Sequence, residues 1–140
     1  LPICSIAGTI RTASREAWVM MEELVREIVS SLLAPLQVQY SVHYRRGVPP
    51  VVNESVSTRI FTHAIEAIGP DVLTDTRQSG GGEDFSWYLE DVPGAMARLG
   101  VWPGVGPQLD LHQPTFDLDE RALGVGVRVF ANIIEQSAGL

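Results

Sequence analysis

The sequence predicts an α/β fold in which helices alternate with strands along the whole chain. Two runs with apolar residues three and four positions apart, at residues 14–33 and 119–134, are typical of amphipathic helices. The run LQVQYSVHY, residues 36–44, alternates apolar and polar side chains as a half-buried strand does. Glycine and proline clusters separate these runs, and no internal repeat or low-complexity tract interrupts them.

The first 44 residues form a predicted β-α-β unit. Residues 6–11 fit a strand, and a helix follows from Ser14 to Leu33, with Ser14 as its N-cap and Glu16 close to the positive end of its dipole. Pro35 ends this helix. Its predicted buried face is Trp18, Met21, Val25, Ile28 and Leu32.

The segment RRGVPPVVN, residues 45–53, predicts a hinge or domain boundary, because Gly47, Pro49 and Pro50 cannot continue a regular element. A helix from Glu54 to Ile68 follows, with Asn53 as its expected cap. Its predicted buried face is Val56, Ile60, Ala64 and Ile68.

The rest of the chain predicts two strands and two helices. The strands are DVLTDTRQS, residues 71–79, and GAMARLGVW, residues 94–102, and between them GGGEDF opens a short helix that runs through Leu89. The last helix begins near Asp119, where two acids have capping-box spacing, and two glycines within it favour close packing. The two acids are Asp117 and Glu120, and the two glycines are Gly124 and Gly126. The predicted buried face of this helix is Leu123, Val127, Phe130 and Ile134.

Composition argues for an ordered protein that binds neither nucleic acid nor a membrane. Hydrophobic residues make up 45% of the chain and charged residues 19%, the mean hydropathy is +0.11, and no apolar run has the length of a membrane span. The net charge is −7 and all ten Lys or Arg positions are Arg, so no basic patch would release counterions from a polyanion. Cys4 is the one cysteine, which excludes an intramolecular disulfide and favours a reducing, cytoplasmic location. The N-terminus does not resemble a signal peptide and lacks an initiator Met, which favours a truncated or processed chain.

His112 is the first candidate for chemistry. A neutral imidazole is the commonest metal-binding side chain, and Pro114 and the following acids would stiffen and orient it. One histidine does not make a metal site, since zinc needs three or four ligands. The alternative is a surface histidine in a loop whose acids cap the last helix.

The glycine–acid segment GGGEDF, residues 80–85, is the second candidate. Its glycines allow close approach of backbone to a ligand, but a phosphate site is disfavoured because the P-loop Lys is missing and Glu83 and Asp84 would repel an anion. The alternative is a flexible turn capped by two acids.

The other polar residues carry weaker signals. His63 is expected to be structural, His43 to face solvent or a partner, and Arg11 to bind a carboxylate or to be solvated. Neither G-x-S-x-G, C-x-x-C nor H-E-x-x-H occurs.

Five blocks in order give the chain a specific resemblance. GTIRT, YRRGVPPVVN, GGEDFSWYL, PGAMARLGV and LHQPTFDLDE resemble the C-terminal part of the zinc-type amidohydrolase and peptidase family, which includes N-acyl-amino-acid amidohydrolases, hippurate hydrolases and carboxypeptidase-G-like enzymes. The match is nearest the N-acyl-amino-acid branch and spans nearly the whole chain.

This resemblance implies a two-domain, two-metal hydrolase that forms a homodimer. Residues 1–52 would be the last β-α-β part of a ferredoxin-like lid and dimerisation domain, and residues 53–140 the C-terminal part of an α/β catalytic domain. The metals would be zinc, or manganese, cobalt or nickel, and the substrate a small N-acyl amino acid or peptide-like amide.

At single positions, the resemblance implies that His112 binds a metal and that Gly81, Gly82, Glu83, Asp84 and Phe85 lie at the rim of the active site. The family's catalytic glutamate belongs to an acid pair upstream of the matched part. The pair Glu22-Glu23 lies in a lid-like helix instead, and Cys4 lacks the context of the family's cysteine ligand.

The chain therefore has no catalytic residue of its own by this reading. Alone, it is expected to bind no metal pair tightly and to turn over no substrate, because dinuclear hydrolysis needs several ligands and a general base. The alternative is a non-catalytic dimerisation or binding module on the same scaffold.

Overall fold

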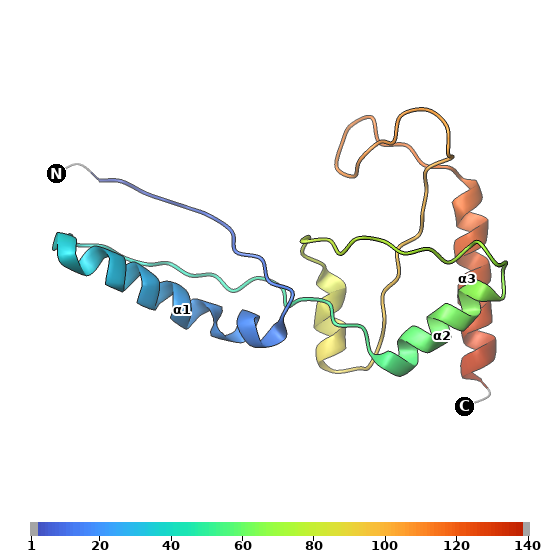
Figure 1. The fold of residues 1–140 in the computed structure, drawn as a ribbon, viewed down its shortest axis with the longest axis horizontal. Coiled ribbons are helices and arrows are strands. Elements are labelled where there is room, and N and C mark those ends of the chain that lie inside the picture. The colour runs from blue at the N-terminus through green and yellow to red at the C-terminus, as the bar shows by residue number, and fades with distance from the viewer. Residues whose placement is uncertain (1–2, 139–140) are drawn as a thin grey trace. The chain divides into compact units, whose positions relative to one another are not determined.

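The computed structural model of the chain describes residues 3–138, which form five helical segments. Figure 1 shows the three α-helices, α1 (Arg15–Leu33), α2 (Ser55–Glu66) and α3 (Arg121–Ser137). Two short 3₁₀ helices accompany them, η1 (Ala34–Leu36) directly after α1 and η2 (Asp84–Glu90) after the glycine segment. None of the helices in this part of the chain is long and apolar enough to span a membrane.

The predicted strands are absent from residues 3–138. No strand forms in segments 6–11, 36–44, 71–79 and 94–102, and Figure 1 shows them as extended traces without arrows. A strand exists through hydrogen bonds to a neighbouring strand, and apolar–polar alternation supplies only one partner of such a pair. Of the predicted α/β pattern, the described residues therefore form only the helices, and the ferredoxin-like arrangement stays a prediction.

The described chain divides into two compact units. One consists of residues up to Val52 together with Arg77–Val92, and the other of Asn53–Thr76 together with the residues from Pro93 onward.

In the first unit, α1 begins and ends as predicted. The Ser14 hydroxyl accepts a hydrogen bond from the Ala17 N–H at 3.2 Å and donates to the Glu16 carboxylate at 2.7 Å. The hydrogen bond from the Ser14 hydroxyl to its carboxylate lowers the pKa of Glu16. At the other end, Pro35 lies in η1, and Gln37 turns the chain with a left-handed φ of 52°.

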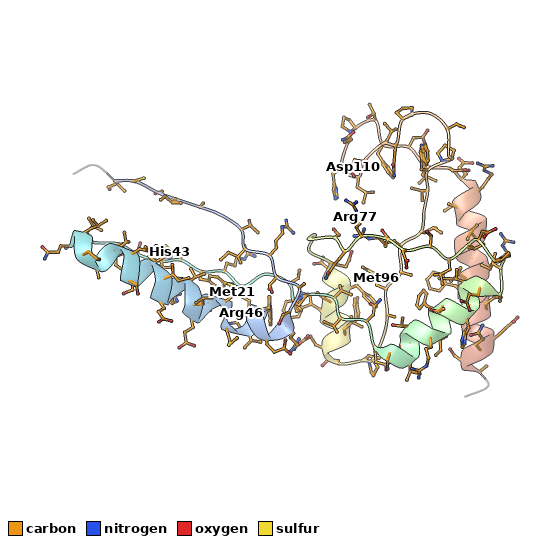
Figure 2. The ribbon with its side chains drawn as sticks, in the orientation of Figure 1. Met21, His43, Arg46, Arg77, Met96 and Asp110 are labelled. Atoms are coloured by element: carbon orange, nitrogen blue, oxygen red, sulfur yellow. The ribbon has the colours of Figure 1, made fainter. Side chains whose placement is uncertain are left out.

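The segment after η1 is attached to α1 by arginine and tryptophan side chains. Arg26 donates to the Val42 carbonyl and Arg46 to the Val19 carbonyl, each at 3.2 Å, and the Trp18 indole N–H donates to the Gly47 carbonyl at the same distance. Figure 2 labels Met21 on α1, and His43 and Arg46 on the segment after η1. The predicted α1 face is half right, because Trp18, Met21 and Val25 are partly covered whereas Ile28 and Leu32 are exposed.

In the second unit, α2 and α3 pack against each other. Ala64 is fully buried, its carbonyl accepts a 2.9 Å hydrogen bond from the Asn132 amide, and the Phe61 and Phe130 rings meet edge to face at 6.4 Å. The predicted α2 face is right at Ile60, Ala64 and Ile68, while Val56 is exposed.

The predicted buried face of α3 is wrong. Its four residues, Leu123, Val127, Phe130 and Ile134, are between 61% and 69% exposed, and Ala122 and Val129 are buried instead. The helix carries two apolar stripes, and the one with small residues packs inward because it permits the closer approach. An added Cβ at Gly126 would already touch Leu99 at 3.4 Å, whereas Gly124 faces open space.

Two predicted helix caps are also wrong. Glu54, not Asn53, caps α2, and the Asn53 amide instead pairs with the Met96 backbone through two 2.9 Å hydrogen bonds. Met96 lies on the segment that precedes α3 (Figure 2). At α3, Glu120 makes no side-chain cap bond.

Candidate functional site

The glycine segment makes its local contacts within the first unit. The Gly81 N–H donates to the Ser79 hydroxyl at 3.0 Å, and an added Cβ at Gly82 would approach Val48 to 3.2 Å. This distance is shorter than that of most Cβ contacts, so position 82, where the backbone passes close to the Val48 side chain, suits a glycine.

The acids of the segment begin η2. Glu83 is its N-cap, with a 3.4 Å bond from the Phe85 N–H, and Asp84 lies in the first turn, where the helix dipole favours a negative charge. Behind them, Ser86 is only 1% exposed, and its hydroxyl donates to the Glu83 carbonyl at 2.6 Å. Phe85 is half-buried, with its ring tilted against Tyr88 at 6.2 Å. Glu83 and Asp84 are thus exposed at the start of η2, and the buried Ser86 hydroxyl stabilises that short helix.

His112 lies in the second unit, in a turn before α3. It is exposed and has a left-handed φ of 66°, which non-glycine residues adopt uncommonly. The turn continues with a 3.0 Å hydrogen bond from the Phe116 N–H to the Gln113 carbonyl. The backbone therefore holds the imidazole outward from the turn at a small conformational cost.

The acids around His112 bind backbone and arginine groups. Asp110 and Asp117 each accept from the N–H of the following residue, at 2.9 and 2.8 Å. Asp119 accepts from the Arg121 side chain at 2.8 Å and from its backbone N–H at 3.0 Å, and the side-chain bond is the main cause of the lowered pKa of Asp119. Within residues 3–138, no hydrogen bond joins these carboxylates to the His112 imidazole.

The other two histidines lie apart along the chain. His63 is exposed in the last turn of α2, and His43 is exposed on the segment that follows η1. Over residues 3–138, the structure contains no group of three or more His, Cys, Asp or Glu side chains able to hold a metal ion. The described residues therefore do not form a metal site by themselves.

The sequence did not predict an aromatic and cationic cluster that connects α1 with η2. Trp18 and Trp87 meet edge to face at 6.1 Å, and the guanidinium carbons of Arg15 and Arg46 lie 5.9 and 5.1 Å from the Trp18 ring centroid. The signal available was weak: Arg15 and Trp18 are three positions apart on one helix, and Trp87 follows the glycine–acid segment.

Comparison with known proteins identifies the class. Residues 5–136 match the model of Peptidase family M20/M25/M40, so the chain belongs to this family. The resemblance found from the five sequence blocks is confirmed.

The individual relatives include two proteins named as deacetylases and one named as a ligase. The chain is 53% identical over 96% of its length to a Rhodococcus jostii protein named "Putative glutamate--cysteine ligase 2-3", of which it covers 17%. It is 32% identical over 90% of its length to an N-acetylcysteine deacetylase of Bacillus subtilis, covering 32% of that protein. It is also 32% identical over 94% of its length to an N-acetyldiaminopimelate deacetylase of Enterococcus faecalis, covering 34%. The chain thus spans between 17% and 34% of these relatives, and no solved structure matches it significantly.

Proposed function

We propose that this chain is the C-terminal segment of a metal-dependent amidohydrolase that cleaves the amide bond of a small N-acyl amino acid. The observation that carries the proposal is the family match over residues 5–136, together with relatives named as deacetylases of N-acetylated amino acids. Residues 1–52 would belong to a lid and dimerisation domain and residues 53–140 to the catalytic domain of a homodimer.

His112 is the metal ligand of this segment in our proposal. The support for it is the family match, which includes the block LHQPTFDLDE, and the left-handed φ of 66° at His112, which is uncommon for a residue other than glycine. The remaining ligands and the general base would come from the larger part of the protein that the chain does not span. A bound divalent ion, zinc or one of manganese, cobalt and nickel, would polarise the amide carbonyl.

The glycine–acid segment Gly81, Gly82, Glu83, Asp84 and Phe85 would form the rim of the substrate pocket. Backbone without side chains at Gly81 and Gly82 lets a substrate approach closely. Glu83 is not proposed as the catalytic base, because its carboxylate faces the first turn of its own helix.

The test is substitution of His112 by Ala in the full-length protein that carries this segment. Hydrolysis of N-acetylcysteine, N-acetyldiaminopimelate and γ-glutamylcysteine should be measured with added zinc, manganese, cobalt or nickel. The variant should lose about 100-fold or more in kcat/KM for whichever amide is cleaved, since even residues that merely support a ligand cost about 10–100-fold. His63→Ala is the matched control and should keep its activity. Full activity in His112→Ala would remove this residue from the site.

A second candidate function is a non-catalytic dimerisation or binding module. The observation that favours it is a set of exposed apolar residues on α1, since such residues are suited to contact with another surface. They include Met20, Leu24, Ile28 and Leu32. The same experiment separates the two: a full-length wild-type protein that hydrolyses none of the amides with any of the metals supports the module.

A further inference from the structure

Residues 11–18, nearly 70 positions earlier in the sequence, hold the glycine–acid segment at both of its ends. Gly80, Gly81 and Gly82 have little conformational preference of their own. Contacts at the two ends must therefore determine where the segment lies.

The front anchor is a charged hydrogen bond. The Arg11 guanidinium donates to the Gly80 carbonyl at 2.8 Å, across 69 positions of sequence. A hydrogen bond with an ionised donor is shorter and stronger than a neutral one, and this distance lies in the charged range. Arg11 thus has a structural partner at the first glycine.

The rear anchor is the aromatic cluster. The Trp18 ring meets the Trp87 ring at 6.1 Å and 76°, an edge-to-face geometry that aromatic rings prefer. Arg15 adds an ion pair with Glu90 at the end of η2 and lies over the Trp18 ring. Arg46 covers the same ring, so Trp18 is fixed on more than one side.

We propose that Arg11, Arg15 and Trp18, named here the clamp residues, position the glycine–acid segment and make residues 77–92 one body with α1. They are positioning residues, because they act on the segment through Gly80, Trp87 and Glu90. The division of the chain supports this inference, since Arg77–Val92 belongs to the same compact unit as α1. The catalytic consequence, an ordered pocket rim, rests on the function proposed above.

The test is hydrogen–deuterium exchange on the full-length protein that carries this segment. The amides to follow are those of Ser86, Asp91 and Val92, which donate to carbonyls within or beside η2. Trp18→Leu should raise their exchange rates about tenfold while the amides of α2 and α3 keep theirs. Trp102→Leu, which removes a half-exposed tryptophan of the other unit, is the matched control and should leave all three amides unchanged.

A double substitution tests the contact itself. If Trp18 and Trp87 act through one another, Trp18→Leu and Trp87→Leu together should raise exchange no more than either alone, whereas independent effects would multiply. Multiplying effects would overturn the rear anchor.

Milder variants decide the case in which Trp18→Leu disturbs the whole chain. If exchange rises in α2 and α3 as well, Trp18→Phe and Arg11→Gln carry the test. Either of them should loosen Ser86, Asp91 and Val92 alone, and unchanged exchange in both would overturn the proposal.

Activity of the full-length protein provides the separate arm. Arg11→Gln and Trp18→Leu should lower kcat/KM about tenfold, and Trp18→Phe should restore part of the loss because it keeps an aromatic edge. Loosened exchange in a protein that hydrolyses no N-acyl amino acid would leave positioning intact and reject the proposed function. Unchanged exchange in an active enzyme would reject positioning alone.

Discussion

The two candidate site segments are held in different ways. The glycine–acid segment is fixed by residues far away in sequence, through Arg11 at Gly80 and Trp18 at Trp87. The His112 turn has a left-handed φ and local hydrogen bonds at Leu111 and Phe116, and the loop that carries it makes one longer connection where the Asp119 N–H donates to the Val101 carbonyl at 2.8 Å. The first geometry depends on side-chain contacts between distant segments, and the second mainly on local backbone structure.

This difference bears on the proposed hydrolase. The glycine–acid segment has its supports within this chain. Among residues 3–138 no group of three or more His, Cys, Asp or Glu side chains able to hold a metal ion includes His112, so in the proposal the other ligands come from outside this chain.

The first expected effect concerns η2, directly after the tertiary-held segment. Ser86→Ala removes the hydroxyl that donates to the Glu83 carbonyl from a position only 1% exposed. The carbonyl keeps the Ser86 N–H as a donor at 3.1 Å, so one hydrogen bond is lost, and we expect the free energy of unfolding to fall by about 0.5–1.5 kcal/mol in urea titrations. Ser79→Ala, which removes an exposed hydroxyl bonded to the Gly81 N–H, is the control and should cost clearly less. Equal losses in the two variants would mean that Ser86 does not organise η2.

The next effect concerns the backbone of the locally held turn. A side chain in the left-handed region costs about 1–2 kcal/mol relative to glycine, and more when it is β-branched. His112→Gly should therefore leave the free energy of unfolding unchanged or raise it, and His112→Val should lower it by about 1–2 kcal/mol relative to the glycine variant. Urea titration of both variants measures the difference. Equal stability of the two would show that the turn does not impose the left-handed conformation.

The same distinction explains what the sequence could predict. α1 was predicted to within one residue at each end, because Ser14 and Pro35 are local signals. His112 and the glycine–acid segment were selected as candidates because each lies in a short motif, and their roles stay predictions. The clamp residues were missed, since nothing in Arg11 or Trp18 indicates a partner about 70 positions later.

Packing choices were equally hidden from sequence. α3 offers two apolar stripes, and periodicity cannot tell which of them is buried; the structure buries Ala122 and Val129 and brings Gly126 close to Leu99, while Phe130 of the other stripe meets Phe61 of α2. Asn53 is a good cap by residue type, yet its amide reached the Met96 backbone and left the cap to Glu54. In both cases a contact between distant segments overrode the local preference.

The smallest expected effect compares the two glutamate caps. Glu54 accepts from the Val56 and Ser57 N–H groups at 2.7 and 2.8 Å, whereas the single Glu83 cap bond measures 3.4 Å. The two backbone bonds, with the nearby serine hydroxyls, lower the pKa of Glu54 from 4.5 to about 2.

A carboxylate with a lowered folded-state pKa stabilises the fold above its unfolded pKa and loses that contribution as the pH falls through the folded one. The melting temperature of wild type should therefore exceed that of Glu54→Gln by a few degrees at pH 7, and the gap should narrow between about pH 4.5 and 2. Thermal unfolding followed by circular dichroism from pH 7 to pH 2.5 measures it, with Glu66→Gln in the last turn of α2 as a control that keeps the cap. A gap as wide at pH 2.5 as at pH 7 would mean that the carboxylate charge contributes nothing to the cap, and that α2 depends on its packing against α3.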